Sequence, residues 1–85
     1  MNEKAIRAQL RTLGLPQPSR WSAEDGSPWA EWVVLDGCGQ VLADRKEVTF
    51  EFEDGVAYMD DDLLSELLSA LRAARVWHQA VSDDA

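Results

Sequence analysis

Residues 48–53 read Val-Thr-Phe-Glu-Phe-Glu, the clearest alternation of apolar and polar side chains in the sequence. Successive side chains of a strand point to opposite faces, so this period of two predicts a β-strand over about residues 47–53. One face of that strand would be buried. The other would carry Thr49, Glu51 and Glu53, as in an antiparallel sheet with a single covered face.

Two further strands are predicted before this stretch. Residues 29–35, Trp-Ala-Glu-Trp-Val-Val-Leu, are rich in the aromatic and branched side chains that suit a pleated surface. Residues 36–39, Asp-Gly-Cys-Gly, tolerate a positive φ angle. They are therefore expected to form a hairpin turn that leads into a return strand over about residues 40–44.

A tight turn is predicted after the alternating stretch, because Asp54-Gly55 is among the strongest short hairpin signals. A two-residue turn there would start a last strand over about residues 56–59. The resulting register places Phe52 opposite Ala57, Phe50 opposite Met59 and Glu51 opposite Tyr58.

The N-terminal residues predict an amphipathic helix over residues 2–13. Ile6, Leu10 and Leu13 recur at spacings of four and three, as one helix face requires. Asn2 is expected to cap this helix and Gly14 to end it. A second face at the same spacings is basic and carries Lys4, Arg7 and Arg11.

Residues 14–28 predict an ordered loop, because prolines and glycine interrupt both helix and sheet hydrogen bonding. Trp21 lies near the middle of this loop and is costly to leave in water. It is expected to pin the loop to the core. The alternative is a surface anchor for a partner.

The main helix is expected over about residues 61–78, followed by a frayed tail over residues 82–85. Its apolar stripe has spacings of one, three, one and three, and consists of Leu63, Leu64, Leu67, Leu68 and Leu71. Asp60, Asp61 and Asp62 stand where carboxylates cap free amide groups and favour the positive end of the helix dipole.

These elements predict a single α+β domain over residues 1–85: a small antiparallel meander of three or four strands flanked by an N-terminal and a C-terminal helix. The helices would cover one sheet face and leave the other open. With 46% apolar residues and four tryptophans, the chain is hydrophobic enough to fold. A single cysteine excludes an internal disulfide, and we expect a cytoplasmic protein without a membrane span.

Charge is segregated along the chain. Residues 1–20 carry four bases and one acid, or +3, whereas residues 21–66 carry thirteen acids and two bases, or −11. A negative field of this density attracts basic proteins and repels nucleic acid and anionic membranes. We therefore expect a protein partner with a basic surface, and neither a nucleic acid nor a membrane as a direct partner.

No catalytic, cofactor or metal site is predicted. Cys38 and the single histidine, His78, are forty residues apart and have no recognisable third partner. The three consecutive residues Asp60, Asp61 and Asp62 would point about 100 degrees apart on a helix, so capping explains them better than cation binding does. We expect a protein that is not an enzyme.

The favoured hypothesis is a non-enzymatic protein-binding domain that blocks a nucleic-acid-handling partner by charge mimicry. Its expected partner-binding residues are Glu47, Glu51, Glu53, Asp54, Tyr58, Asp60, Asp61 and Asp62. In size and acidity the chain resembles small inhibitors made by phages and mobile elements, including anti-CRISPR and nuclease-immunity proteins. The alternative is a structural or assembly subunit that forms a homo-oligomer or joins a larger complex.

Overall fold

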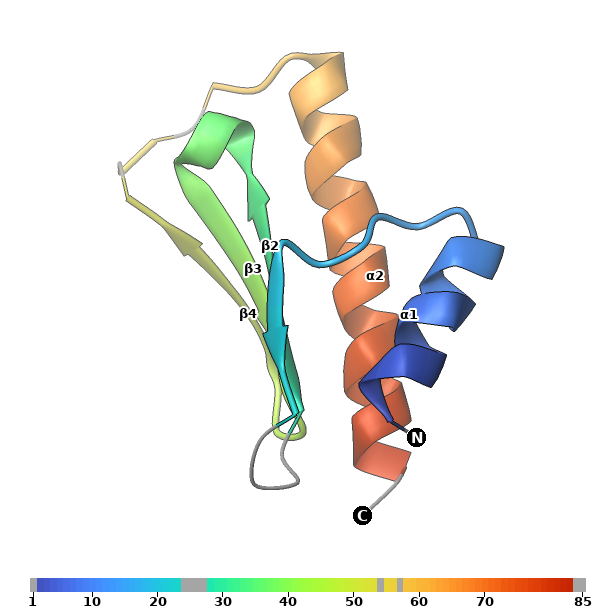
Figure 1. The fold of residues 1–85 in the computed structure, drawn as a ribbon. Helices are drawn as coiled ribbons and strands as arrows, with labels where there is room; N and C mark the ends of the chain where they lie inside the picture. The colour runs from blue at the N-terminus through green and yellow to red at the C-terminus, as the bar shows by residue number, and fades with distance from the viewer. Residues whose placement is uncertain (1, 24–27, 54, 57, 84–85) are drawn as a thin grey trace.

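The computed structural model describes residues 2–23, 28–53, 55–56 and 58–83. Within these residues the elements are α1 (Glu3–Thr12), β1 (Arg20–Ser22), β2 (Trp29–Val34), the 3-10 turn η2 (Leu35–Gly37), β3 (Gly39–Ala43), β4 (Val48–Phe52) and α2 (Asp61–Asp83). The strands form an antiparallel meander in the order β1-β2-β3-β4. Both helices lie on the same side of this sheet (Figure 1). The predicted α+β architecture is confirmed.

The register of the strands decides which side chains the helices cover. Directly paired residues of antiparallel strands share a face, so the pairs Trp32 with Val41 and Val41 with Phe50 define one row. This inner row faces α2. Trp32 and Val41 are buried there, whereas Phe50 on the edge strand β4 stays 42% exposed. The helix therefore covers the centre of the sheet better than it covers the β4 edge.

The core is centred on two tryptophans from distant parts of the chain. Trp77 of α2 is fully buried and meets Trp32 of β2 edge to face, with ring centroids 6.2 Å apart. Ile6 and Leu10 of α1 are also fully buried, as predicted, whereas Leu13, predicted for the same face, is 54% exposed. Aromatic pairs in this geometry add to the stability that burial alone provides.

The first helix begins and ends as expected. The Asn2 side chain accepts a hydrogen bond from the Ala5 amide at 2.8 Å, and Gly14 takes a positive φ of 70° just beyond the helix. The loop predicted over residues 14–28 is wrong in one respect, because residues 20–22 pair with β2 as β1. A three-residue strand is too short to produce a recognisable alternation. Trp21 in β1 lies beneath the guanidinium of Arg7, 4.0 Å from the ring centroid, and stays partly exposed.

The turn between β2 and β3 confirms the expected hairpin. Asp36 and Gly37 both have positive φ angles, as the sequence indicated. Leu35 also has a positive φ, of 55°, which the sequence did not predict. A large residue tolerates this strained conformation only where its surroundings hold it. Leu35 is buried, and its amide donates to the Glu66 carboxylate at 3.2 Å.

The predicted strand over residues 56–59 is wrong. Of the residues described there, Val56, Tyr58 and Met59 are in irregular structure, and β4 pairs only with β3. Glu51 therefore lies opposite Gln40 rather than Tyr58, and Phe50 lies opposite Val41 rather than Met59. Two residues of this prediction lie outside the described residues. They are Asp54 of the expected turn and Ala57, the expected partner of Phe52. The chain instead crosses to the start of α2 (Figure 1).

The second helix is longer than predicted, because it continues past His78 to Asp83. Two contacts hold its last turns against the β3–β4 turn. His78 Nδ1 hydrogen-bonds with the Asp44 carbonyl at 2.7 Å, and Ser82 Oγ donates to the Arg45 carbonyl at 2.9 Å. Val81 is buried as well. The frayed tail predicted from residue 82 is thus wrong for Ser82 and Asp83, while residues 84–85 lie outside the described part.

Replacing Asp60 with alanine should destabilise the protein by about 1 kcal/mol. Asp60 Oδ1 accepts a hydrogen bond from the Leu63 amide at 2.9 Å, which satisfies a free amide at the start of α2. Urea unfolding followed by circular dichroism would measure the loss. Asp60→Ser should retain most of the stability, since serine also caps helices. If serine were as harmful as alanine, the negative charge and not the hydrogen bond would be the stabilising feature.

Candidate functional site

The β4 strand forms a free edge of the sheet. At its two ends, the Asp44 amide donates to the Glu47 carbonyl and the Glu53 amide donates to the Cys38 carbonyl, at 3.0 and 3.2 Å. Antiparallel ladders alternate between residues that bond inward and residues that bond outward. Odd-numbered residues of this strand therefore bond to β3. The amide and carbonyl groups of Val48, Phe50 and Phe52 point away from the sheet.

Three predicted partner-binding carboxylates follow this edge. Glu47, Glu51 and Glu53 have the same strand parity, so their side chains point to the sheet face opposite the helices. All three are exposed, and among the described residues no side chain forms an ion pair or hydrogen bond with their carboxylates. They span about 20 Å at strand spacing. Lys46 and Arg45 lie in the turn beside Glu47, so the negative charge is strongest toward Glu53.

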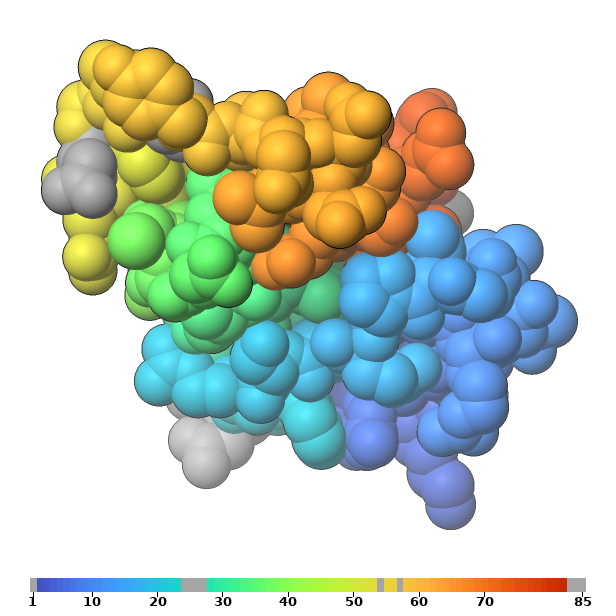
Figure 2. Space-filling model, turned by 90° about the horizontal axis from the view of Figure 1, so that it is seen from above, coloured from blue at the N-terminus to red at the C-terminus, as the bar shows by residue number. Residues whose placement is uncertain are grey.

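Four of the other predicted residues, Tyr58, Asp60, Asp61 and Asp62, lie at the upper end of the molecule (Figure 1). Residues 58–62, which include Tyr58 and the three consecutive aspartates, connect the end of β4 to the start of α2 (Figure 2). Tyr58 is 90% exposed, and Asp61 and Asp62 are exposed in the first turn of α2. Asp60 is exposed too, although its carboxylate caps the helix. Asp54 lies outside the described residues.

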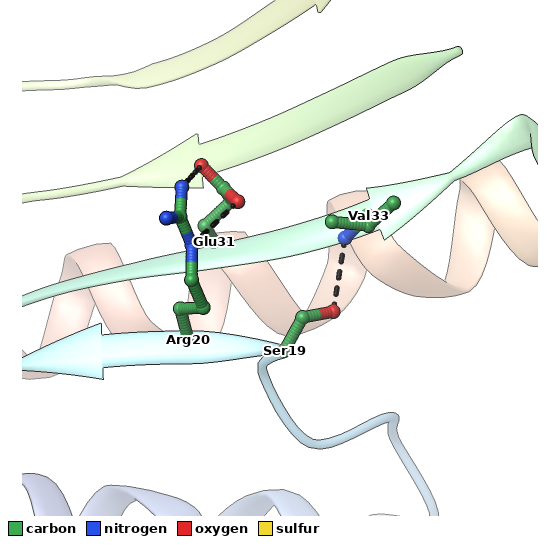
Figure 3. A network of polar contacts seen from close by, with 4 residues as sticks. All are labelled: Ser19, Arg20, Glu31 and Val33. Atoms are coloured by element: carbon green, nitrogen blue, oxygen red, sulfur yellow. Dashed lines mark hydrogen bonds and ion pairs between the residues drawn. The ribbon is translucent and has the colours of Figure 1, made fainter. Parts of the chain in front are cut away.

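The broad outward face of the sheet is less acidic than the sequence suggested. Glu31, in the centre of this face, is buried and receives two hydrogen bonds from Arg20, at 3.1 and 2.8 Å (Figure 3). The hydrogen bonds to Glu31 and the negative charge of Glu31 raise the pKa of the Arg20 guanidinium. Beside this pair, Ser19 Oγ accepts a hydrogen bond from the Val33 amide (Figure 3). The acidic residues therefore form a strip along β4 and the upper end, rather than a platform across the sheet.

The outward face also carries apolar residues. Trp29 and Val33 are 37% and 44% exposed. A shallow hollow of about 280 Å³ lies beside Trp29 and is lined by Trp29, Leu42, Ala43, Asp44, Glu47 and Thr49. A large, rigid side chain beside carboxylates is a common hot spot in protein interfaces. The register of β2 was needed to show that Trp29 points outward and Trp32 inward.

A second apolar surface lies on the helix side of β4. His78 and Ser82 show which flank of α2 faces the β3–β4 turn. Leu64, Leu68 and Leu71 share that flank, because successive steps of four, three and seven residues lead from Leu64 through Leu68 and Leu71 to His78. Leu64 and Leu68 are 42% and 49% exposed, and Phe50 lies on the facing strand. The sequence indicated this surface, because the stripe of five leucines is wider than the part of α2 that the sheet covers.

The candidate catalytic residues are far apart. Cys38 lies just before β3, whereas His78 contacts Asp44 at the other end of that strand. The six residue steps from Cys38 to Asp44 correspond to about 20 Å at strand spacing. The part of the chain that the structure describes contains no group of three or more His, Cys, Asp or Glu side chains that could hold a metal ion.

None of the described helices is long and apolar enough to cross a membrane. No protein-family model, curated protein or solved structure matches this chain.

Proposed function

We propose that this chain is a non-enzymatic protein-binding domain whose acidic strip docks on the basic surface of a nucleic-acid-handling protein. The strip consists of Glu47, Glu51 and Glu53 along β4, with Tyr58, Asp60, Asp61 and Asp62 at the upper end. Its carboxylates would occupy sites that otherwise bind phosphates, and the chain would thereby inhibit its partner.

The observation that carries this proposal is the exposure of the carboxylates along β4: no ion pair joins Glu47, Glu51 or Glu53 to another described residue. Arg20 pairs with Glu31, which is buried outside the strip. Arg7 instead stacks on Trp21 and donates to Gln17. Unpaired carboxylates in one region produce a negative electrostatic field. This field speeds the encounter with a basic protein and makes contact with another acidic surface unfavourable.

Specificity would come from the apolar side chains beside the charges. Tyr58 is almost fully exposed, and Trp29 borders the hollow that contains Glu47. Aromatic side chains of this kind bury a large area at low cost in conformational entropy. The separation of Cys38 from His78 favours binding over catalysis, and the lone cysteine suits the reducing cytoplasm in which we place the interaction.

Binding should weaken by at least about tenfold when salt rises from roughly 50 to 300 mM, because ions screen exposed charges. The measurement is fluorescence anisotropy of the labelled chain against a panel of basic nucleases and nucleic-acid-binding effector complexes. Unlabelled DNA should compete for the same site on any protein that binds. Binding that is indifferent to ionic strength, or that leaves DNA binding unchanged, would contradict charge mimicry.

A further inference from the structure

We infer that the partner contributes an extended segment with alternating basic and apolar residues, which adds antiparallel to the β4 edge. Its apolar side chains would cover the apolar surface beside β4, here called the β4–α2 surface and defined by Val48, Phe50, Phe52, Leu64, Leu68 and Leu71. Its basic side chains would lie beside Glu47, Glu51 and Glu53. This inference rests on the proposed function, because it specifies how the basic partner is held.

The backbone of β4 supplies the first requirement for such a segment. Val48, Phe50 and Phe52 point their amide and carbonyl groups outward, and no described residue outside β3 bonds to this strand. Unpaired groups on an edge strand accept an added strand through regular backbone hydrogen bonds. An antiparallel segment continues the pattern of the sheet and is slightly more stable than a parallel one.

The β4–α2 surface supplies the second requirement. The residues of β4 that have outward backbone groups also point their side chains toward the helix side. Residues of an added strand that bond to them would place their own side chains on that side, next to Phe50 and Leu68, which are 42% and 49% exposed. Phe52, at the upper end of this surface, also lines a hollow of about 270 Å³ together with Met59 and Leu63. An apolar side chain would fill this space.

The charges supply the third requirement and identify the chemistry of the segment. The alternate residues of an added strand would lie on the outward side, directly beside Thr49 and Glu51 and close to Glu47 and Glu53. Lysine or arginine at these positions would pair with carboxylates that no described side chain neutralises. Arg75 lies lower on the same flank of α2, so basic residues are favoured most near Glu53 and Asp61.

A second copy of this chain fits the same edge poorly. If two β4 strands paired antiparallel about Phe50, each Glu47 would lie opposite Glu53 of the other copy. Like charges placed directly opposite destabilise a strand pair. Charged residues on an edge strand are a common protection against self-association. The occupant is therefore a basic segment of another protein.

The test uses a fluorescent peptide, acetyl-Lys-Ile-Lys-Val-Lys-Ile-Lys-amide, titrated with the full chain at about 50 mM salt. A second peptide, acetyl-Lys-Lys-Ile-Val-Ile-Lys-Lys-amide, has the same composition and charge but no alternation. The alternating peptide should bind at least about tenfold more tightly, since only it can place charges and apolar groups on opposite sides.

The backbone contact is tested without changing the protein. N-methylation of the central valine removes an amide that would face β4, and should weaken binding by about tenfold or more. N-methylation of the lysine that follows it modifies an amide on the far side and should have little effect. If both methylations, or neither, weakened binding, antiparallel addition to the edge would be wrong.

The β4–α2 surface is tested with Leu68→Ser, matched by Leu13→Ser outside this surface, since both leucines are about half exposed. Only Leu68→Ser should weaken the alternating peptide, by about tenfold. Equal binding of both peptides, unchanged by Leu68→Ser, would overturn the inference. So would salt-sensitive self-association through β4. The proposed function would survive either of these results if basic proteins still bound the chain and released their DNA. The proposed function would fail together with the inference if no basic protein bound the chain.

Discussion

Replacing Trp77 with alanine should lower the free energy of unfolding by about 3–5 kcal/mol. Trp77 is the largest fully buried side chain, and its ring packs edge to face on Trp32. A domain of this length is expected to be stable by roughly 4–13 kcal/mol, so this single cavity would remove a large part of the total. Urea unfolding followed by far-ultraviolet circular dichroism would measure the change.

Trp29→Ala is the matched control, because it removes the same side chain from the outward face, where Trp29 is 37% exposed. It should cost only about 1 kcal/mol. Trp77→Phe should lose less than Trp77→Ala, because it keeps an aromatic ring and removes an indole N–H that has no acceptor among the described residues. Equal losses for Trp29→Ala and Trp77→Ala would contradict the position of the core.

The parts of the fold that were predictable are those with a strong local period. Alternation identified β4, and the spacing of Ile6 and Leu10 identified the buried face of α1. The sequence-based predictions fail where contacts between distant parts of the chain determine the secondary structure. β1 forms because Arg20 and Trp21 pair with residues of β2, which lies later in the chain. The last turns of α2 persist because Ser82 bonds to the β3–β4 turn.

The Asp54-Gly55 signal shows how local turn chemistry can mislead. Asp-Gly favours a hairpin only if a second strand follows it. Val56, Tyr58 and Met59 have suitable residue types for a strand, yet these residues lead to α2, whose leucine-rich flank lies near β4. The β4 edge consequently stays open instead of being paired with a further strand on that side. The opposite edge is formed by β1.

The candidate site was predictable in composition but not in shape. The exposed positions of Glu47, Glu51, Glu53 and Tyr58 agree with the sequence-based selection. The sequence could not show that Glu31 pairs with Arg20, since eleven residues separate them. It also could not show which aromatic residues stay exposed, because that depends on the register of strands from different parts of the chain.

Removing the three carboxylates beside β4 should weaken binding to a basic partner by roughly 10- to 150-fold. The triple variant is Glu47→Gln, Glu51→Gln and Glu53→Gln, and each lost charge pair should cost about 0.5–1 kcal/mol. Folding stability should be unchanged or slightly higher, because the like charges repel one another in the folded state. Glu3→Gln removes one charge from α1, on the other side of α2, and should have little effect on affinity.

The most direct test of the acidic strip is a paired titration of the wild-type chain and this triple variant against the same protein, the basic nuclease that the wild type binds most tightly, at about 50 mM salt. We predict that the triple variant has a Kd weaker by roughly 10- to 150-fold and a wild-type unfolding transition. An unchanged Kd for a properly folded triple variant would show that the carboxylates along β4 do not form the docking surface.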